Sequence, residues 1–195
     1  MKTAIVIRHS KRDHIENPSE HVKTLLNDEG IELARNLGKL LAKEFKSIKV
    51  YSSPIQRCIQ TGEYMQEAFE NSSAVQLSNV LGEPGPFIYG DAIESFSKLG
   101  TTGVVEAIEN GKSLPLIRSE AEGTKILLDF VRRETSSSEG DCVTVFVTHD
   151  ACIAPVINFF TGEFFSENHW IEFLGGLKIK FNTNGLAVER WKGVE

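Results

Sequence analysis

Continuous apolar runs alternate along the chain with segments of helical periodicity. Residues 3–8 and 142–148 are apolar and rich in β-branched side chains over their whole length, which is typical of strands buried on both faces. Residues 48–52 have similar strand character, and a short strand is expected near 75–80. Helical patterns separate these runs, so the sequence predicts an α/β layered fold with a largely parallel sheet.

Capping residues predict where three helices begin. Asn27 precedes an apolar repeat that extends to Phe45. The segment "SPIQ" places Ser53 as N-cap, Pro54 at the first helical position and Gln56 as the partner of a capping box, in a helix to about Phe69. Ser119 and Glu122 repeat the capping-box pattern before a helix that extends to about Arg133.

The remaining segments are less uniform. Another helix is expected over residues 151–160, followed by two or three strands with an Asn184-Gly185 turn between Phe181 and Leu186. Residues 91–118 show no clear pattern. The chain contains no internal repeat and no linker, and its 195 residues suit one domain.

Composition narrows the classes of function. The formal net charge of -6 argues against general nucleic-acid binding, so any site for a polyanion must be local. The apolar run behind Lys2 is too short for a signal peptide, and no segment is long enough to cross a bilayer. Three scattered cysteines favour neither disulfides nor structural zinc, and a reducing cytoplasm is the expected location.

Chemically potent side chains follow three of the predicted strands. The first strand ends in Arg8-His9, and a later one ends in His149-Asp150. Between them, the strand that ends at Ser52 leads into a helix whose first turn carries Arg57. Ligands of such sheets bind beyond the carboxyl ends of the strands. Two guanidiniums, two imidazoles and a helix N-terminus would there form a phosphate site, with an imidazole as possible nucleophile.

At these residues the sequence resembles the histidine phosphatase superfamily, which has the phosphoglycerate-mutase-like fold. The resemblance covers most of the chain through four segments in the family's order: "RH" at the end of the first strand, "LNDEGIELARNLGKLL", "YSSPIQRCIQTGEYM" and "VTHDACIAPVINFF". It implies a three-layer α/β fold with helices on both faces of the sheet. It also implies that residues 1–195 form a single catalytic domain.

The family's roles can be carried over residue by residue. The resemblance implies that His9 is the nucleophile that takes the phosphoryl group, and that Arg8, Arg57 and His149 bind its nonbridging oxygens. It implies hydrolysis of a phosphomonoester without a metal or other cofactor. Alternatives are a phosphoglycerate-type mutase and a catalytically weak module that binds a phospholigand. The expected partner is a small phosphorylated substrate, with a nucleotide and a phosphoprotein as open alternatives, while nucleic acid and membrane are not expected.

The sequence departs from the family after the nucleophile. Ser10 stands where relatives usually have Gly, and Lys11 and Arg12 replace the usual acidic and polar residues. We assign Ser10 to the pocket, where its hydroxyl could be a further donor. Lys11 and Arg12 could hold a second anionic group of the substrate, although a solvated charged loop is an equal alternative.

Two carboxylates are candidates for the proton donor to the leaving oxygen. Glu83 lies in the loop "LGEPGPF", where the mutase-like branch of the family carries its acid. Asp150 follows His149 directly, as in the acid-phosphatase branch, although it could equally cap the next helix. We favour Asp150 over Glu83, with a shared role left open.

Other reactive or aromatic side chains have ordinary interpretations. The three remaining histidines lack the spacing of metal ligands, and two of the cysteines are expected to pack within helices. Four hydrophobic side chains of the least regular region could line a substrate pocket or pack into the core. These residues are His14, His21 and His169; Cys58 and Cys152; and Phe87, Ile88, Tyr89 and Phe96.

Overall fold

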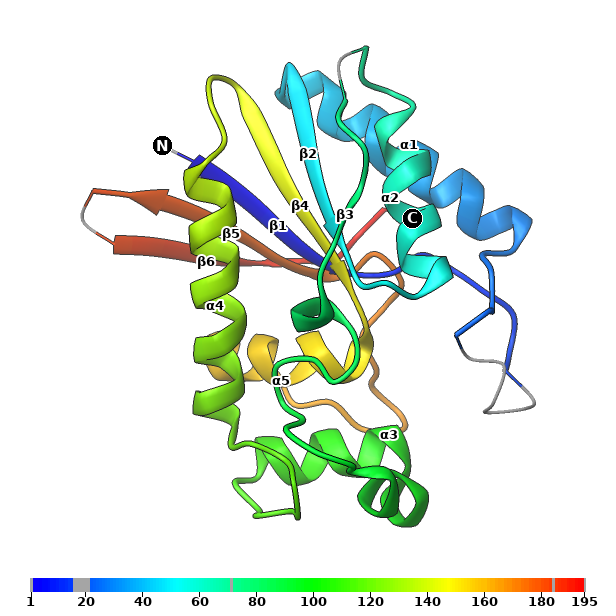
Figure 1. Cartoon of the computed structure of the whole chain (residues 1–195), viewed down its shortest axis with the longest axis vertical. Coiled ribbons are helices and arrows are strands. Elements are labelled where there is room, and N and C mark those ends of the chain that lie inside the picture. The colour runs from blue at the N-terminus through cyan, green and yellow to red at the C-terminus, as the bar shows by residue number, and fades with distance from the viewer. Residues whose placement is uncertain (1, 16–21, 71, 184, 195) are drawn as a thin grey trace.

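A six-stranded, largely parallel sheet forms the centre of the molecule (Figure 1). The computed structural model describes residues 2–15, 22–70, 72–183 and 185–194. The strands lie in the order β3-β2-β4-β1-β5-β6; β3, β2, β4 and β1 are parallel, and β5 and β6 continue the sheet as an antiparallel hairpin. Their bounds are β1 (Lys2–Arg8), β2 (Ser47–Ser52), β3 (Gln76–Leu77), β4 (Cys142–Thr148), β5 (Gly176–Asn182) and β6 (Gly185–Trp191).

Helices cover both faces of this sheet, which confirms the predicted three-layer α/β fold. Helices α1 (Asp28–Glu44) and α2 (Gln56–Gln66) pack on one face. Helices α4 (Glu120–Ser136) and α5 (Asp150–Thr161) pack on the other. Helix α3 (Ile93–Glu109) lies beyond α5, away from the strands (Figure 1).

Strand β1 shows why the core is divided into two. Successive side chains of a strand point to opposite faces, and both faces of β1 are buried, as its apolar run predicts. Ile5 and Ile7 pack with α1 and α2, whereas Ala4 and Val6 pack with α4 and α5. Burial on both sides therefore holds the end of β1 in one place.

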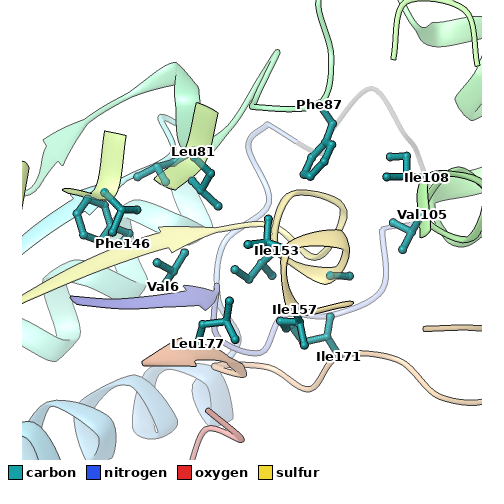
Figure 2. Packing of buried hydrophobic residues seen from close by; sticks show 14 of the residues in the cluster. Val6, Leu81, Phe87, Val105, Ile108, Phe146, Ile153, Ile157, Ile171 and Leu177 are labelled. Atoms are coloured by element: carbon teal, nitrogen blue, oxygen red, sulfur yellow. The ribbon is translucent and has the colours of Figure 1, made fainter. Parts of the chain in front are cut away.

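Helix α5 packs between the sheet and α3. In Figure 2, Ile153 and Ile157 of α5 lie between Val6 of β1 on one side and Val105 and Ile108 of α3 on the other. All five side chains are almost completely buried. The start of α5, which follows His149, is consequently fixed by packing on two sides.

The capping predictions are confirmed for two helices and wrong for the third. Asn27 accepts a hydrogen bond from the Gly30 N–H at 2.9 Å, and the reciprocal capping box of Ser119 is present. Helix α2, by contrast, begins at Gln56 without a side-chain cap. The Ser53 hydroxyl accepts from the Ile55 N–H, before the helix, and its oxygen lies 2.9 Å from His149 Nε2.

The segment without a clear pattern contains helix α3. Gly100 interrupts it with a φ of 65°, a conformation that side chains rarely adopt, and this break obscures the helical period in the sequence. The predicted strand at 75–80 is shorter than expected: β3 has two residues, and the 3-10 helix η2 (Asn79–Leu81) follows. The hairpin of β5 and β6 is present, but Asn184 of its predicted turn lies outside the described residues.

The aromatic residues of the irregular region divide between core and surface. Phe87 is buried, and a Cβ at Gly123 would lie 2.2 Å from its ring. Ile88 and Phe96 pack partly buried against the same core, whereas Tyr89 is exposed beside the Arg118 guanidinium. Core packing therefore accounts for the first three side chains.

None of the helices in the described part of the chain combines the length and apolarity that a bilayer crossing requires. Cys58, Cys142 and Cys152 are free thiols.

Glu109, at the end of α3, is a buried carboxylate with one unpaired oxygen. Oε2 accepts a hydrogen bond from the Phe165 N–H at 3.0 Å, while Oε1 is buried and has no partner among the described residues. Burial raises the pKa of Glu109 to about 7, although the bond from Phe165 lowers it, and the negative charges of Glu120, Glu106 and Glu163 raise it further. The folded state therefore favours the protonated carboxyl.

We expect Glu109 to make stability fall with rising pH. Its pKa is higher in the folded chain than the ordinary 4.5, so the folded state binds more protons between pH 4.5 and about 7. Glu109→Gln, which resembles the protonated form, should gain stability over the native chain across this window. Urea unfolding at several pH values measures the difference, with Glu94→Gln on the exposed surface of α3 as control. A difference that does not change with pH would contradict the expectation.

Candidate active site

The carboxyl ends of β2, β4 and β1 lie side by side, as the phosphate-site hypothesis requires. Arg8 is the register partner of Thr148, and Ser52 that of Val147. Beyond the strands, the His9 N–H donates to the Thr148 carbonyl at 2.9 Å, and the Ser53 N–H donates to the Val147 carbonyl at 3.0 Å. The side chains that follow the three strands are therefore brought to one edge of the sheet.

Two hydrogen bonds define the state of the His9 ring. Nδ1 lies 2.7 Å from the Ser10 carbonyl oxygen, which can only accept, so Nδ1 carries the proton. Arg57 Nε, which can only donate, lies 3.0 Å from Nε2. Nε2 therefore presents its lone pair toward the guanidinium of Arg57. A neutral imidazole with this lone pair exposed to an anion site is a competent nucleophile.

His149 is held in the opposite tautomer. Its Nδ1 lies 3.1 Å from Arg57 Nη2, a donor, so Nδ1 accepts. Its Nε2 then carries a proton and donates to Ser53 Oγ at 2.9 Å. The two imidazoles stand edge to face, with centroids 5.6 Å apart, and Arg57 contacts both.

Arg8 is fixed on several sides. Its Nη1 donates to the Ile171 carbonyl at 2.6 Å, and its Nη2 forms an ion pair with Asp150 Oδ2 at 3.0 Å. The ring of Phe173 lies 4.2 Å from the guanidinium carbon. Arg8 Nε is buried without a partner among the described residues. A buried donor in this state is a natural contact for an oxygen of a bound anion.

Positive charge is concentrated at this site although the chain as a whole is acidic. Burial lowers the pKa of His9 well below 6.5, and the charges of His149, Arg57 and Arg8 lower it further. Burial also lowers the pKa of Arg8 and of Arg57. Each of these groups would gain from a bound anion, because burial penalises isolated charge.

The two candidate acids occupy different surroundings. Asp150 is bound to Arg8 and accepts from the Trp170 indole at 3.2 Å and from the Ala151 N–H at 2.9 Å. Burial would raise the pKa of Asp150, but the charge of Arg8 and the indole hydrogen bond outweigh this effect, and the pKa falls to about 2. Asp150 is therefore a stable carboxylate in the free protein.

Glu83 lies at the exposed rim of the site. Thr148 Oγ1 donates to the Leu81 carbonyl at 2.7 Å, which ties η2 to the end of β4. The next residue, Gly82, packs against Ser53, where a Cβ would meet Oγ at 2.4 Å. The charge of Glu83 also reaches Arg57, whose pKa it raises against the lowering by burial. Glu83 therefore lies near Arg57 in the fold, although the two residues are well separated in the sequence.

The side chains of the loop that follows His9 have different surroundings. Ser10 Oγ donates to the Gly30 carbonyl at 2.7 Å, so this hydroxyl is engaged with α1. Lys11 forms an exposed ion pair with Glu29 at 2.6 Å. Arg12 lies closer to the site, since its charge lowers the pKa of both Arg8 and Arg57. Its Nη1 donates to the Asp13 carbonyl at 2.7 Å. Binding of a second anion by Lys11 or Arg12 stays a prediction.

The remaining reactive side chains have structural surroundings. Cys58 Sγ lies 3.6 Å from His149 Nε2, and burial raises the pKa of its thiol; burial also raises the pKa of Cys152 to about 12. His169 pairs with Glu163 on the surface, His14 is exposed, and His21 lies outside the described residues. Within the described ranges, no three His, Cys, Asp or Glu side chains are grouped to hold a metal ion.

Several site residues could not be found from the sequence. Ser53 was expected to cap α2 and instead lies against His149. Trp170, Ile171 and Phe173 belong to the segment between α5 and β5 and carry no recognisable motif. Their closeness to Arg8 follows from the antiparallel return of β5 along β1.

Comparison with known proteins agrees with the resemblance seen in the sequence. The family model "Histidine phosphatase superfamily (branch 1)" matches residues 4–84, a range that includes Arg8, His9, Arg57 and Glu83. No curated protein matches the chain. The resemblance to the histidine phosphatase superfamily is therefore confirmed over residues 4–84.

Solved structures share the fold over the whole chain. A mycobacterial glucosyl-3-phosphoglycerate phosphatase in complex with VO3 has a TM-score of 0.68 at 14% identity, covering 100% of both chains. An Entamoeba histolytica phosphoserine phosphatase mutant with phosphoserine gives 0.61 at 19%, covering 98% of this chain and 97% of that one. A Bacillus anthracis phosphoglycerate mutase gives 0.62 at 18%, covering 98% and 93%.

We expect the His9 ring to be neutral, with its proton on Nδ1, near pH 6.5, the ordinary pKa of histidine. Burial, the neighbouring His149 ring and the charges of Arg57 and Arg8 disfavour a second proton, and the Ser10 carbonyl selects the tautomer. Nitrogen-15 chemical shifts of the imidazole measure both properties, and His9→Gln identifies the resonances. A ring that is doubly protonated at this pH would contradict the expectation.

Proposed function

We propose that this chain, as its match to the histidine phosphatase superfamily suggests, hydrolyses small phosphomonoesters through a phosphohistidine at His9. The observation that carries the proposal is the neutral His9 ring, whose Nε2 lone pair lies among Arg8, Arg57 and His149. We take residues 1–195 as one catalytic domain. The similar structures include phosphatases and a mutase, so the fold by itself is compatible with either reaction.

The first chemical step is transfer of the phosphoryl group to His9. In the free site, Arg57 Nε donates to the nitrogen that must attack phosphorus. Binding of a phosphate ester would turn this donor toward a nonbridging oxygen, while Arg8 Nε, already fixed in place, and His149 would contact the other oxygens. Nε2 then forms the bond to phosphorus while the bond to the leaving oxygen breaks. The positive groups stabilise the charge on the transferring group without a metal ion.

Glu83 is our candidate for the proton donor, in place of the Asp150 that the sequence favoured. Asp150 is paired with Arg8, and its lowered pKa opposes a role as an acid. Glu83 is exposed at the rim, near Arg57 and beside the contact of Gly82 with Ser53. A protonated Glu83 would give its proton to the leaving alcohol. The resulting carboxylate would then take a proton from a water molecule that attacks phosphorus, while the phosphorus–nitrogen bond breaks. His9 Nε2 regains its lone pair, and phosphate is released.

Hydrolysis is preferred over mutase chemistry because the segment that follows Glu83 offers few cations to hold a second anionic group. Residues 84–118 contain Lys98, Lys112 and Arg118. Lys98 pairs with Glu94 on the surface, and Arg118 donates to the carbonyls of Pro86 and Ile88. A mutase must retain a reorienting, highly anionic intermediate, which requires free positive charge at that place.

His9→Ala should abolish the phosphoenzyme and turnover because it removes the attacking nitrogen. Incubation with a labelled phosphate ester in EDTA, followed by a quench in base, measures the acid-labile label, with His14→Ala as control. Thermal unfolding checks that the variant is folded. Label retained on His9→Ala would place the nucleophile elsewhere, and loss of native activity in EDTA would contradict the metal-free mechanism. Phosphoryl transfer to added 3-phosphoglycerate would indicate a mutase.

Glu83→Gln should slow alkyl phosphates far more than nitrophenyl phosphate. An alkoxide needs protonation as it leaves, whereas a nitrophenolate does not, and general acid catalysis contributes about 10²–10⁴-fold. The ratio of kcat/KM on the two esters, compared with that of the native chain, measures the effect. An equal loss on both esters would exclude Glu83 as the donor.

A further inference from the structure

Asp150 links the site to a tryptophan that no motif predicts. Its Oδ2 accepts from Trp170 Nε1 at 3.2 Å and pairs with Arg8 Nη2 at 3.0 Å. Its Oδ1 accepts from the Ala151 N–H at 2.9 Å, at the start of α5. One carboxylate thus joins β1, α5 and the segment before β5.

The contacts around Arg8 leave its guanidinium a single orientation. The Ile171 carbonyl and Asp150 engage its two terminal nitrogens, and the Phe173 ring packs against its carbon at 4.2 Å. Arg8 Nε remains as a buried donor without a partner among the described residues. Geometric fixation of such a donor matters because electrostatic catalysis depends on groups that are already aimed at the reacting atoms.

The segment that carries Trp170 is itself anchored. Phe165 donates its N–H to Glu109, and its ring packs edge to face with Trp170 at 6.2 Å. Arg190 of β6 bridges Glu163 at 2.8 Å and Glu172 at 2.6 Å. The segment that places Trp170 next to Asp150 is therefore held by hydrogen bonds, ion pairs and ring packing.

We propose that Trp170 and Asp150 are positioning residues that aim Arg8 at the phosphoryl group, and that Asp150 does not donate the proton to the leaving oxygen. This inference rests on the proposed phosphatase function. The carboxylate must stay ionised to hold Arg8, and the indole N–H stabilises that form. Removing the indole N–H should weaken the orientation of Arg8 while the other groups that touch the substrate stay in place.

The first test separates positioning from proton donation at Asp150. Asp150→Asn keeps the shape of the side chain but removes its charge. A positioning role predicts a loss of kcat/KM on the order of a hundredfold that is equal for nitrophenyl and alkyl phosphates. A proton donor predicts a selective loss on the alkyl ester, which would overturn the inference. The exposed Asp129→Asn on α4 is the matched control.

The second test uses the two tryptophans of the chain. Trp170→Phe keeps a ring but removes the N–H, and should lower kcat/KM roughly tenfold on both esters, the value of one hydrogen bond to a charged group. The pKa of Asp150 should rise, so the acidic limb of the pH profile should move to higher pH. Trp191→Phe is the control, because Trp191 Nε1 is buried without a partner among the described residues. Equal kcat/KM values and pH profiles for the two variants would overturn the inference.

Binding of inorganic phosphate distinguishes failure of this inference from failure of the proposed function. Titration calorimetry measures its affinity without turnover, and we expect roughly tenfold weaker binding by Trp170→Phe than by Trp191→Phe. If the native chain forms no phosphoenzyme but Trp170→Phe still binds phosphate more weakly than Trp191→Phe, only the phosphatase proposal is contradicted. A native chain that forms phosphoenzyme while both variants bind phosphate equally would contradict the positioning role alone.

Discussion

The concentration of positive charge at the carboxyl ends of β1 and β4 is the constraint on which the rest of the structure depends. Arg8 and Arg57 are both buried next to His9 and His149. Water cannot solvate these buried charges. Carbonyl oxygens, neutral imidazole nitrogens and one carboxylate that is paired with Arg8 therefore stabilise them. A small bound anion, as the proposed function requires, would stabilise these buried charges further.

The same constraint explains the state of His9. A protonated imidazole beside two guanidiniums would be repelled and desolvated, so the ring stays neutral and keeps a lone pair. The Ser10 carbonyl selects the nitrogen that keeps the proton. Ser10 is in turn held by Thr61 of α2 at 3.0 Å and by Gly30 of α1 at 2.7 Å. The helices on one face of the sheet thus determine which nitrogen is available for chemistry.

The elements on the opposite face of the sheet fix the position of Arg8. Helix α5 is buried between β1 and α3 (Figure 2). Its first residue, Asp150, forms an ion pair with Arg8. The antiparallel strand β5 returns the chain beside β1, which places Ile171 and Phe173 against the same guanidinium. The position of Arg8 therefore depends on three segments that lie far apart in the sequence.

The sequence by itself determined the α/β class, the buried strands and the set of groups at their ends, because these follow from local periodicity, caps and short motifs. It did not reveal α3, whose pattern is broken at Gly100, or the place of Ser53, which lies against His149 instead of capping a helix. Only the tertiary structure decided the surroundings of Asp150 and Glu83. A carboxylate becomes an acid or an anchor through burial and neighbouring charge, and those neighbours, Arg8 and Trp170 for Asp150, come from distant parts of the chain.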